Sequence, residues 1–499
     1  MARDPYDTPA MRQFTRFKAE HPGCVLFFRM GDFYEMFGDD AVEMSRVLGL
    51  TLTERPKGVP LAGLPHHQLH NYLKKAIDAG YRVAVCDQVQ DPKDAKGVVE
   101  RAVTRVVSAG TLVDESLLGD DPAAVAAVAR RGDGWAGAAV DLSTGRFTLF
   151  QAGSDNLAEH IARLGVRELL HPENDAEDSG ETATEPGLVR TPRPAWQFRP
   201  DEARGALLGQ FGVATLEGFG LADDDPAVGP AGAVVAYLIE TQSVSSEPTS
   251  GGKWATSGGE FQGQRRTLAH LRPPAYENDS ALCRLDAVSL RALEVVRTIR
   301  GDGRDADGSL LGLFTSERGL LHTPMGRRLI RDWLCRPLAE VPAIEARQRA
   351  VATLVGDQQA AAEVCAALDK MPDAGRIAGR IALGRATPRD IVALADALER
   401  LGPIRSALSG APAFAGIDAV LGETEAMLST LADEIRASCV DDPPATLRQG
   451  GLIRDGVDES LDEARLLQRD AGRWLAEYQT RLIEQHDLPS LKVGFNKVF

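Results

Sequence analysis

The chain has 499 residues, which is too long for a single hydrophobic core and indicates three or four domains. Hydrophobic residues make up 43% of it and charged residues 26%, a composition that excludes disorder along most of its length. The formal net charge of −16 excludes binding to nucleic acid through a general excess of positive charge. Residues 1–118, however, carry fifteen Lys and Arg against sixteen Asp and Glu, so contact with a polyanion there would be weak and local.

The cysteines indicate a reducing environment. All six are far apart in the sequence and none forms a Cys-x-x-Cys pair, so we expect buried free thiols, without a zinc site or disulfides. The N-terminus lacks the apolar segment of a signal peptide, and no apolar run is long enough to span a bilayer. Together these features predict a cytoplasmic protein.

The first domain, residues 1–118, is predicted to be small and of mixed α/β type. Thr8 is a favourable N-cap and Pro9 a favourable first residue for a helix that ends at residues 21–23 and places Met11, Phe14 and Phe17 on one face. The segments that follow are a strand at 25–28, helices at 41–48 and 67–79, and a strand at 81–86.

The segment Arg29–Glu35 lies at the end of the first of these strands. Gly31 and Asp32 favour a turn, and we expect a helix-like segment just beyond it, with the ring of Phe33 presented beside the carboxylate of Glu35. A ring so placed can wedge between stacked bases while the carboxylate bonds the displaced base. The alternative is that Phe33 is a core residue and Glu35 a solvated one. For a tripeptide as common as Phe-x-Glu, this alternative is favoured when the tripeptide is considered alone.

A second α/β domain is predicted over residues 119–250. Residues 135–142 and 145–150 flank Ser143 and Thr144 and indicate a hairpin, and helices are expected at 155–164 and 231–242. An acidic, Pro-rich loop is expected over 171–194. Asp141 lies where a first metal ligand of a nuclease could be, but no partner motif accompanies it, so we expect a surface residue or one that stabilises the turn.

The remainder of the chain is predicted to be helical. A Ser- and Gly-rich linker covers 243–260, helices dominate from residue 282, and 457–485 forms a long amphipathic helix before a strand that begins at 491. His66, His67 and His70 have metal-like spacing but lack the Glu of a His-Glu-x-x-His motif, so no metal site is expected. The sequence contains no Gly-x-x-x-x-Gly-Lys-Ser/Thr motif, which a phosphate-binding loop needs.

Several motifs, in order and at matching spacing, resemble the MutS family of bacterial DNA mismatch-recognition proteins. The motifs are Thr8–Phe14, Phe28–Glu35, Leu50–Thr53, Pro60–His67, Ala84–Gln88 and Gly110–Glu115, and in the helical part Asp286–Glu294, Thr323–Leu334 and Ala386–Asp390. The resemblance implies a mismatch-recognition domain over 1–118 and a ribonuclease-H-like connector over 119–250. It further implies a helical lever or core domain over 251–440 and part of a clamp domain over 441–499.

The resemblance also implies a function and its residues. The chain would bind mismatched or unpaired bases in double-stranded DNA to initiate repair, and would be associated with the nucleoid when bound. Phe33 would stack on the mispaired base from the minor groove, and Glu35 would hydrogen-bond the displaced base. Met30 and Arg55 are weaker candidates for contacts near the kink and the backbone. No catalytic or metal-binding residue is implied.

Family members carry an ATPase domain beyond the clamp, with ATP and magnesium as cofactors. We expect these 499 residues to end within the clamp, to hold no cofactor and not to hydrolyse ATP, because they lack a phosphate-binding loop. The family partners are a second copy, bound largely through the ATPase domain, and a MutL-like repair protein. Two other functions stay open: a structure-selective nuclease acting through the ribonuclease-H-like unit, and a truncated scaffold that does not bind DNA.

Overall fold

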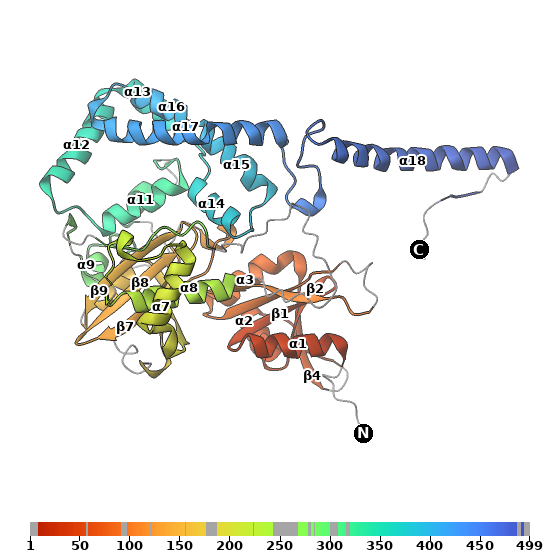
Figure 1. Cartoon of the computed structure of the whole chain (residues 1–499), viewed down its shortest axis with the longest axis horizontal. Helices are drawn as coiled ribbons and strands as arrows, with labels where there is room; N and C mark the ends of the chain where they lie inside the picture. The colour runs from red at the N-terminus through yellow and green to blue at the C-terminus, as the bar shows by residue number, and fades with distance from the viewer. Residues whose placement is uncertain are drawn as a thin grey trace. The chain divides into compact units, whose positions relative to one another are not determined.

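A computed structural model describes residues 8–55, 58–90, 97–119, 122–154, 156–175, 187–222, 224–242, 268–277, 281–283, 285–299, 308–315, 320–486 and 491–493. Two regions built on β-sheets come first and a mainly helical region follows (Figure 1), which confirms the predicted fold class. The chain divides into two compact units. One comprises residues 1–386 with 410–415, and the other comprises residues 387–409 with 416–499.

The first sheet has six strands in the order β3-β4-β2-β1-β5-β6, with β1 and β5 parallel and the other neighbours antiparallel. Its strands are β1 (Cys24–Met30), β2 (Phe33–Phe37), β3 (Thr53–Arg55), β4 (Val59–Pro65), β5 (Arg82–Gln88) and β6 (Arg101–Val107). Its helices are α1 (Pro9–Glu20), α2 (Asp39–Leu48), η1 (His66–Gln68), α3 (Leu69–Asp78) and the short α4 (Glu115–Leu118).

Helix α1 covers part of one face of this sheet, as its sequence predicts. The Thr8 hydroxyl oxygen accepts a hydrogen bond of 3.3 Å from the amide of Met11, which caps the helix. The ring of Phe14 packs edge-on against those of Phe28 and Phe37, with centroids 5.7 and 4.9 Å away. The opposite face of the sheet is covered by α2 and α3, whose apolar residues pack against the other side of β1 and β2. On the same face as α1, Phe33 is exposed and Glu35 is half-buried.

The structure corrects one prediction in this region. The segment after Gly31 and Asp32 is not helix-like but strand β2, and the next helix begins only at Asp39. From Phe33 to Met36 the exposure of β2 alternates: Phe33 is exposed, Tyr34 and Met36 are buried, and Glu35 is half-buried, while Phe37 is buried against Phe14 of α1. This two-residue period is that of a strand with one covered face.

The second sheet has the order β11-β10-β7-β8-β9-β12, in which β7, β8 and β9 are antiparallel and the outer strands join in parallel. The strands are β7 (Ala124–Arg131), β8 (Gly134–Asp141), β9 (Arg146–Gly153), β10 (Val166–Pro172), β11 (Val189–Arg193) and β12 (Ala275–Tyr276). The helical segments are α5 (Leu157–Arg163), η2 (Glu173–Asp175), η3 (Ala195–Phe198), α7 (Pro200–Phe211), η4 (Glu217–Phe219) and α8 (Val228–Gln242).

The predicted hairpin and the two predicted helices of this region are confirmed, but the predicted loop over 171–194 is wrong in part. Residues 189–193 form β11, which runs parallel to β10 at the sheet edge. A five-residue strand that contains Pro192 shows little strand pattern in the sequence, and an edge position tolerates a proline.

A buried carboxylate joins the two sheet regions. Glu168 of β10 is fully buried and accepts hydrogen bonds from Thr191 of β11 at 2.8 Å and from the Tyr237 hydroxyl of α8 at 2.7 Å. From the segment after β6, it also accepts from the Ser108 hydroxyl and from the amide of Gly110, the latter at 3.3 Å. Burial, and then the charge of Glu168, raise the pKa of Tyr237 well above its ordinary value, so the phenol keeps the proton it donates.

The helical segments after residue 285 begin in the first unit and continue in the second. They are α9 (Ala287–Ala292), α10 (Gly312–Thr315), α11 (Pro324–Cys335), α12 (Val341–Gly356), α13 (Gln358–Leu368), α14 (Ala374–Ala382), α15 (Pro388–Glu399), α16 (Leu401–Leu408), η6 (Pro412–Phe414), α17 (Ala415–Ser438), η7 (Leu447–Gln449) and α18 (Glu459–His486). Within the second unit, α15 and α17 pack around Ala395 and Ile435, and Arg436 bonds Glu399 at 2.7 Å.

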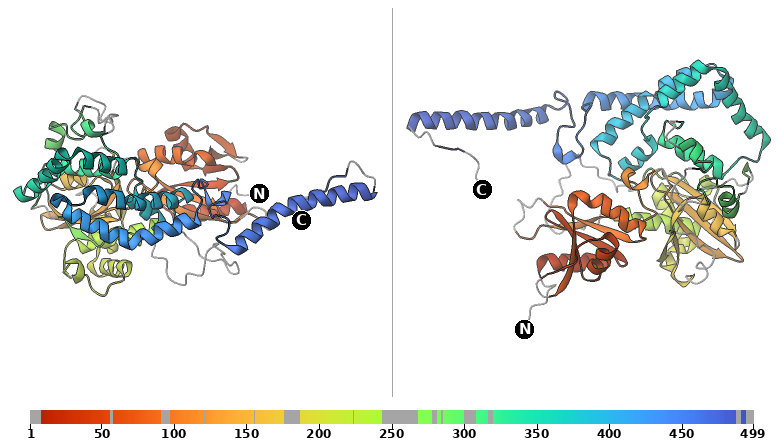
Figure 2. Two further views of the ribbon diagram at one scale, coloured as in Figure 1. Left: turned by 90° about the horizontal axis from the view of Figure 1, so that it is seen from above. Right: turned by 180° about the vertical axis from the view of Figure 1, so that it is seen from behind.

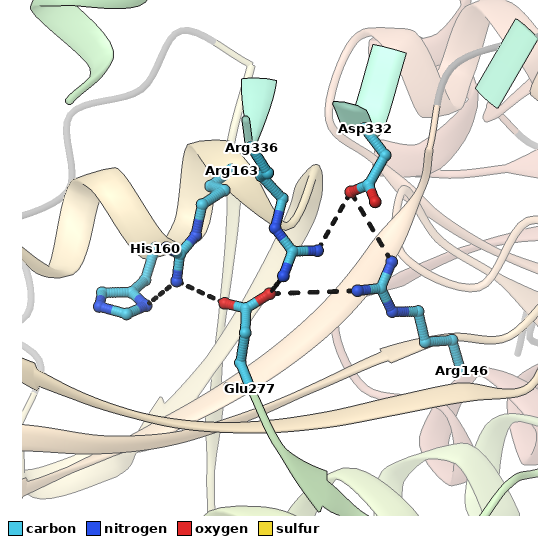
Figure 3. A network of polar contacts seen from close by, with 6 residues as sticks. All are labelled: Arg146, His160, Arg163, Glu277, Asp332 and Arg336. Atoms are coloured by element: carbon cyan, nitrogen blue, oxygen red, sulfur yellow. Dashed lines mark hydrogen bonds and ion pairs between the residues drawn. The ribbon is translucent and has the colours of Figure 1, made fainter. Parts of the chain in front are cut away.

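An ion-pair network ties α11 to the second sheet (Figure 3). The side chain of Glu277, after β12, is nearly fully buried and pairs with Arg163 of α5 and Arg336 at the end of α11. Arg336 also donates to Asp332 at 3.1 Å. Burial, and then the nearby Arg146 and Arg163, lower the pKa of Arg336 to about 10, so it remains charged at neutral pH and compensates Glu277.

The predicted long helix at 457–485 is confirmed as α18, which both views of Figure 2 show as one continuous helix. Residues 491–493 are not a strand, and the rest of the predicted final strand, like the predicted linker at 243–260, lies outside the described residues. All six cysteines are free thiols, but the expectation that they are buried fails for Cys283 and Cys365, which are exposed. Within the described residues, no helix is both long and apolar enough to cross a membrane.

Candidate nucleic-acid interface

The β1–β2 hairpin presents the two principal candidate residues. β1 and β2 pair so that Met30 lies opposite Phe33 and Phe28 lies opposite Glu35, with only Gly31 and Asp32 between the strands. Gly31 has a φ of +59°, the positive value that suits the first position of a two-residue hairpin turn. Phe33 is therefore the first residue after a tight turn.

Phe33 and Glu35 lie on the same face of β2, because they are two residues apart in a strand. The ring of Phe33 is 49% exposed, which is high for an aromatic residue in a central strand, and Glu35 is half-buried beside it. Met30 is half-buried on the same face. The sequence-predicted ring and carboxylate are thus brought together on one face of the sheet.

The turn is held from both sides. The backbone carbonyl of Asp32 accepts a bond of 2.9 Å from the amide of His66, and the Nδ1 atom of the same histidine lies 3.2 Å from that oxygen. On the reverse face, the hydroxyl of Tyr34 donates to Asp87 of β5 at 2.5 Å. Burial, and then the charge of Asp87, raise the pKa of Tyr34, so its phenol remains protonated.

Arg101 supports the hairpin and was missed by the sequence reasoning. Its side chain is 6% exposed and lies over the ring of Phe28, 5.0 Å from the centroid. It donates to the carbonyl of Arg29 at 2.7 Å and to that of Val99 at 2.8 Å, and one nitrogen lies 3.4 Å from the sulfur of Met30. Burial lowers its pKa, yet an arginine stays charged at neutral pH. Because it is 72 residues from Arg29, no local motif could mark it.

The remaining candidate, Arg55, is the last residue of the short strand β3 and lies opposite Val59 of β4. Its side chain is outside the described part of the structure. Its proposed contact with the DNA backbone therefore stays a prediction, as do the roles of Phe33, Glu35 and Met30.

Asp141, His66 and His67, which were considered above as metal ligands, have structural partners. Asp141 accepts from the amide and the hydroxyl of Ser143 at 2.9 and 2.7 Å, which matches the predicted turn-stabilising role. The ring of His66 contacts the Asp32 carbonyl and the edge of the His67 ring. Among the described residues, no group of three or more His, Cys, Asp or Glu side chains is placed to hold a metal ion.

Comparisons with known proteins extend over nearly the whole chain. Three family models match in succession: MutS domain I at residues 8–116, MutS domain II at 123–248 and MutS domain III at 288–488. Curated relatives named DNA mismatch repair protein MutS are 38% identical in Salinibacter ruber, 39% in Symbiobacterium thermophilum and 34% in Methanococcoides burtonii. Each match covers 99% of this chain but only 52%, 54% and 54% of the relative, so the chain spans about half the length of these proteins.

Proposed function

The chain belongs to the MutS family, and we propose that it binds mismatched or unpaired bases in double-stranded DNA as a step in mismatch repair. The observation that carries this proposal is the half-exposed ring of Phe33 beside Glu35, on a hairpin braced from both sides. The ring lies on a central strand of the sheet, on the same face as the carboxylate, so both groups can contact one ligand.

Phe33 is the proposed wedge. Inserting it from the minor groove unstacks one base step, which costs a few kcal/mol and least where base pairing is already defective. Stacking of the ring on the base returns about 1–3 kcal/mol. Preference for a mismatch therefore comes mainly from the lower free energy needed to deform mispaired DNA and does not depend on the base sequence.

Glu35 is the proposed partner of the displaced base. As a carboxylate it accepts a hydrogen bond from a base N–H, and as the protonated acid it donates one to a purine N7. Since it lies two residues from Phe33 on the same face, the base that stacks on the ring is within reach of its carboxyl group. Met30 and Arg55 are proposed to contact the DNA near the kink and at the backbone.

The proposed partners and cofactors follow from the family. Mismatched duplex is the proposed ligand of these residues, while a second copy and a MutL-like protein are proposed partners of the longer family protein. We propose that the 499 residues use no ATP or metal of their own, since their sequence holds no phosphate-binding loop. The nuclease alternative gains no support, because Asp141 is engaged in the β8–β9 turn and the described residues offer no metal cluster.

Phe33→Ala tests the proposal. Loss of the stacking contact should reduce affinity for a single-mismatch duplex by about 1–3 kcal/mol and bring it close to that for matched duplex. Affinity for matched duplex should change much less, because it depends on phosphate contacts. Both dissociation constants are measured for the full chain at one fixed salt concentration.

The control is Trp196→Ala, which removes a similarly exposed ring from η3, in the region of the second sheet. Trp196 is 51% exposed. This variant should leave both affinities unchanged. An unchanged ratio of mismatch to matched affinity in Phe33→Ala would refute the wedge, and a wild-type chain without mismatch preference would refute the proposed function.

A further inference from the structure

A glycine stands in the interior of β4 beside the candidate site. Gly63 lies directly opposite Glu35 in the β2–β4 pairing, and Pro65, two residues further on, lies opposite Phe33. The register runs without a shift from Phe33 to Phe37, so no bulge accounts for the glycine. Opposite residues share a face of the sheet, so Gly63 lies on the same face as Phe33 and Glu35.

The fold itself does not require glycine at this position. Its φ is not in the left-handed range, and a Cβ atom there would lie 3.6 Å from the Tyr34 carbonyl oxygen, an ordinary contact. Gly137 of β8 differs from Gly63: a Cβ atom there would lie 2.1 Å from the ring of Phe150, so the fold does require glycine at that position. Glycine destabilises the interior of a strand, and at Gly63 no steric contact explains its presence. A glycine of this kind often marks a position where a ligand approaches the backbone closely.

The space that the glycine leaves is between the two candidate side chains. A Cβ at this position would lie 3.8 Å from both the Phe33 ring and the Glu35 Cγ, so larger side chains would fill the gap between ring and carboxylate. A nucleobase is flat, and to stack on the ring while bonding the carboxylate at about 3 Å it must lie close to the backbone between them.

We infer that Gly63 is a specificity-determining residue whose bare backbone forms the floor of a notch for the mispaired base. The inference rests on the proposed function and deepens it, because it names the residue that admits the base. Phe33 and Glu35 supply the attraction, and Gly63 supplies the room for both contacts to form on one base.

The test compares Gly63→Ala and Gly63→Val with the wild-type full chain. Valine favours strands, so Gly63→Val should keep or raise the denaturant midpoint of unfolding. It should nevertheless lower the ratio of mismatch to matched affinity by at least about tenfold. Gly63→Ala should give an intermediate ratio, and affinity for matched duplex should be unchanged in both. The matched control is Gly205→Ala in α7, where a Cβ meets nothing within 4 Å; it should leave DNA binding unchanged.

Failure of this inference is distinguishable from failure of the proposed function. If wild type prefers the mismatch and Phe33→Ala removes the preference, but Gly63→Val keeps it, only the role of Gly63 is overturned. The inference is also overturned if either Gly63 variant lowers the unfolding midpoint, since the glycine would then serve the fold. A wild-type chain without mismatch preference overturns both.

Discussion

At the scale of single residues, Glu35 combines an attractive and a repulsive effect. Its carboxyl group can bond one displaced base, while its charge repels the phosphates of any duplex brought close. Only the hydrogen bond depends on the mismatch, because a base is displaced toward Glu35 only in a deformed duplex. The repulsion acts on every duplex. Substitutions that separate hydrogen bonding from charge can therefore distinguish a recognition role from a structural one.

We expect Glu35→Ala to lower mismatch preference while affinity for matched duplex stays constant or rises. Glu35→Gln keeps a hydrogen-bonding group without the charge and should retain part of the mismatch binding, with the two variants separated by about 1–3 kcal/mol. Dissociation constants for both duplexes, measured at two salt concentrations, check this. Equal losses on every DNA in both variants would assign Glu35 to the fold.

At the scale of elements, the β1–β2 hairpin depends on contacts that come from distant parts of the chain. Arg101 holds the Arg29 carbonyl and lies over the ring of Phe28, while Asp87 holds Tyr34 on the reverse face. The exposed ring is thus fixed by residues more than 50 positions away along the chain.

Arg101→Met should loosen the hairpin, because methionine fills the space of the stem but cannot donate to the two carbonyls. Hydrogen bonds from a charged donor are worth about 1.5–3 kcal/mol each, so unfolding free energy should fall by at least about 2 kcal/mol. Mismatch preference should fall with it, and Arg101→Lys should restore part of both. Chemical denaturation and duplex binding are the measurements.

The control for Arg101 is Arg46→Met on the exposed side of α2, which should shift stability by less than about 0.5 kcal/mol. Full stability in Arg101→Met together with normal mismatch preference would show that the hairpin needs no such support.

The sequence predicted correctly those elements that are determined by neighbouring residues, such as helix caps and the spacing of apolar side chains. Thr8 and Pro9 define the start of α1, and the spacing of Met11, Phe14 and Phe17 gives its buried face, as the structure confirms. The segment after Gly31 was predicted wrongly because five residues are too few to separate a strand period from a helical one. The roles of Arg101 and Gly63 depend on strand pairing between distant segments, which a single sequence does not reveal.

At the scale of the whole molecule, buried charges hold successive regions of the first unit together. Glu168 gathers donors from β11, α8 and the segment after β6, and Glu277 gathers Arg163 and Arg336 from α5 and the end of α11. Truncating such a group leaves its buried partners unsatisfied, which costs more than the contacts themselves contribute.

Glu168→Ala should lower the unfolding free energy of the chain by about 3 kcal/mol or more, because four donors lose their acceptor. Glu168→Gln should be less harmful, since it keeps the size and one acceptor oxygen. Denaturant titration followed by circular dichroism measures both. Glu217→Ala at an exposed site should stay within about 0.5 kcal/mol of wild type, and an equally small loss at Glu168 would contradict the argument.

The convergence on Glu168 also limits the motion of the first sheet relative to the second. Rotation about the chain between them would break the buried hydrogen bonds that Ser108 and Gly110 donate to Glu168, at a free energy of at least a few kcal/mol. A hinged-open state would then hold on the order of 1% of the molecules or fewer. The two sheets should therefore tumble in solution as one body, with a common rotational correlation time. A force that acts on Phe33 would then also move the second sheet.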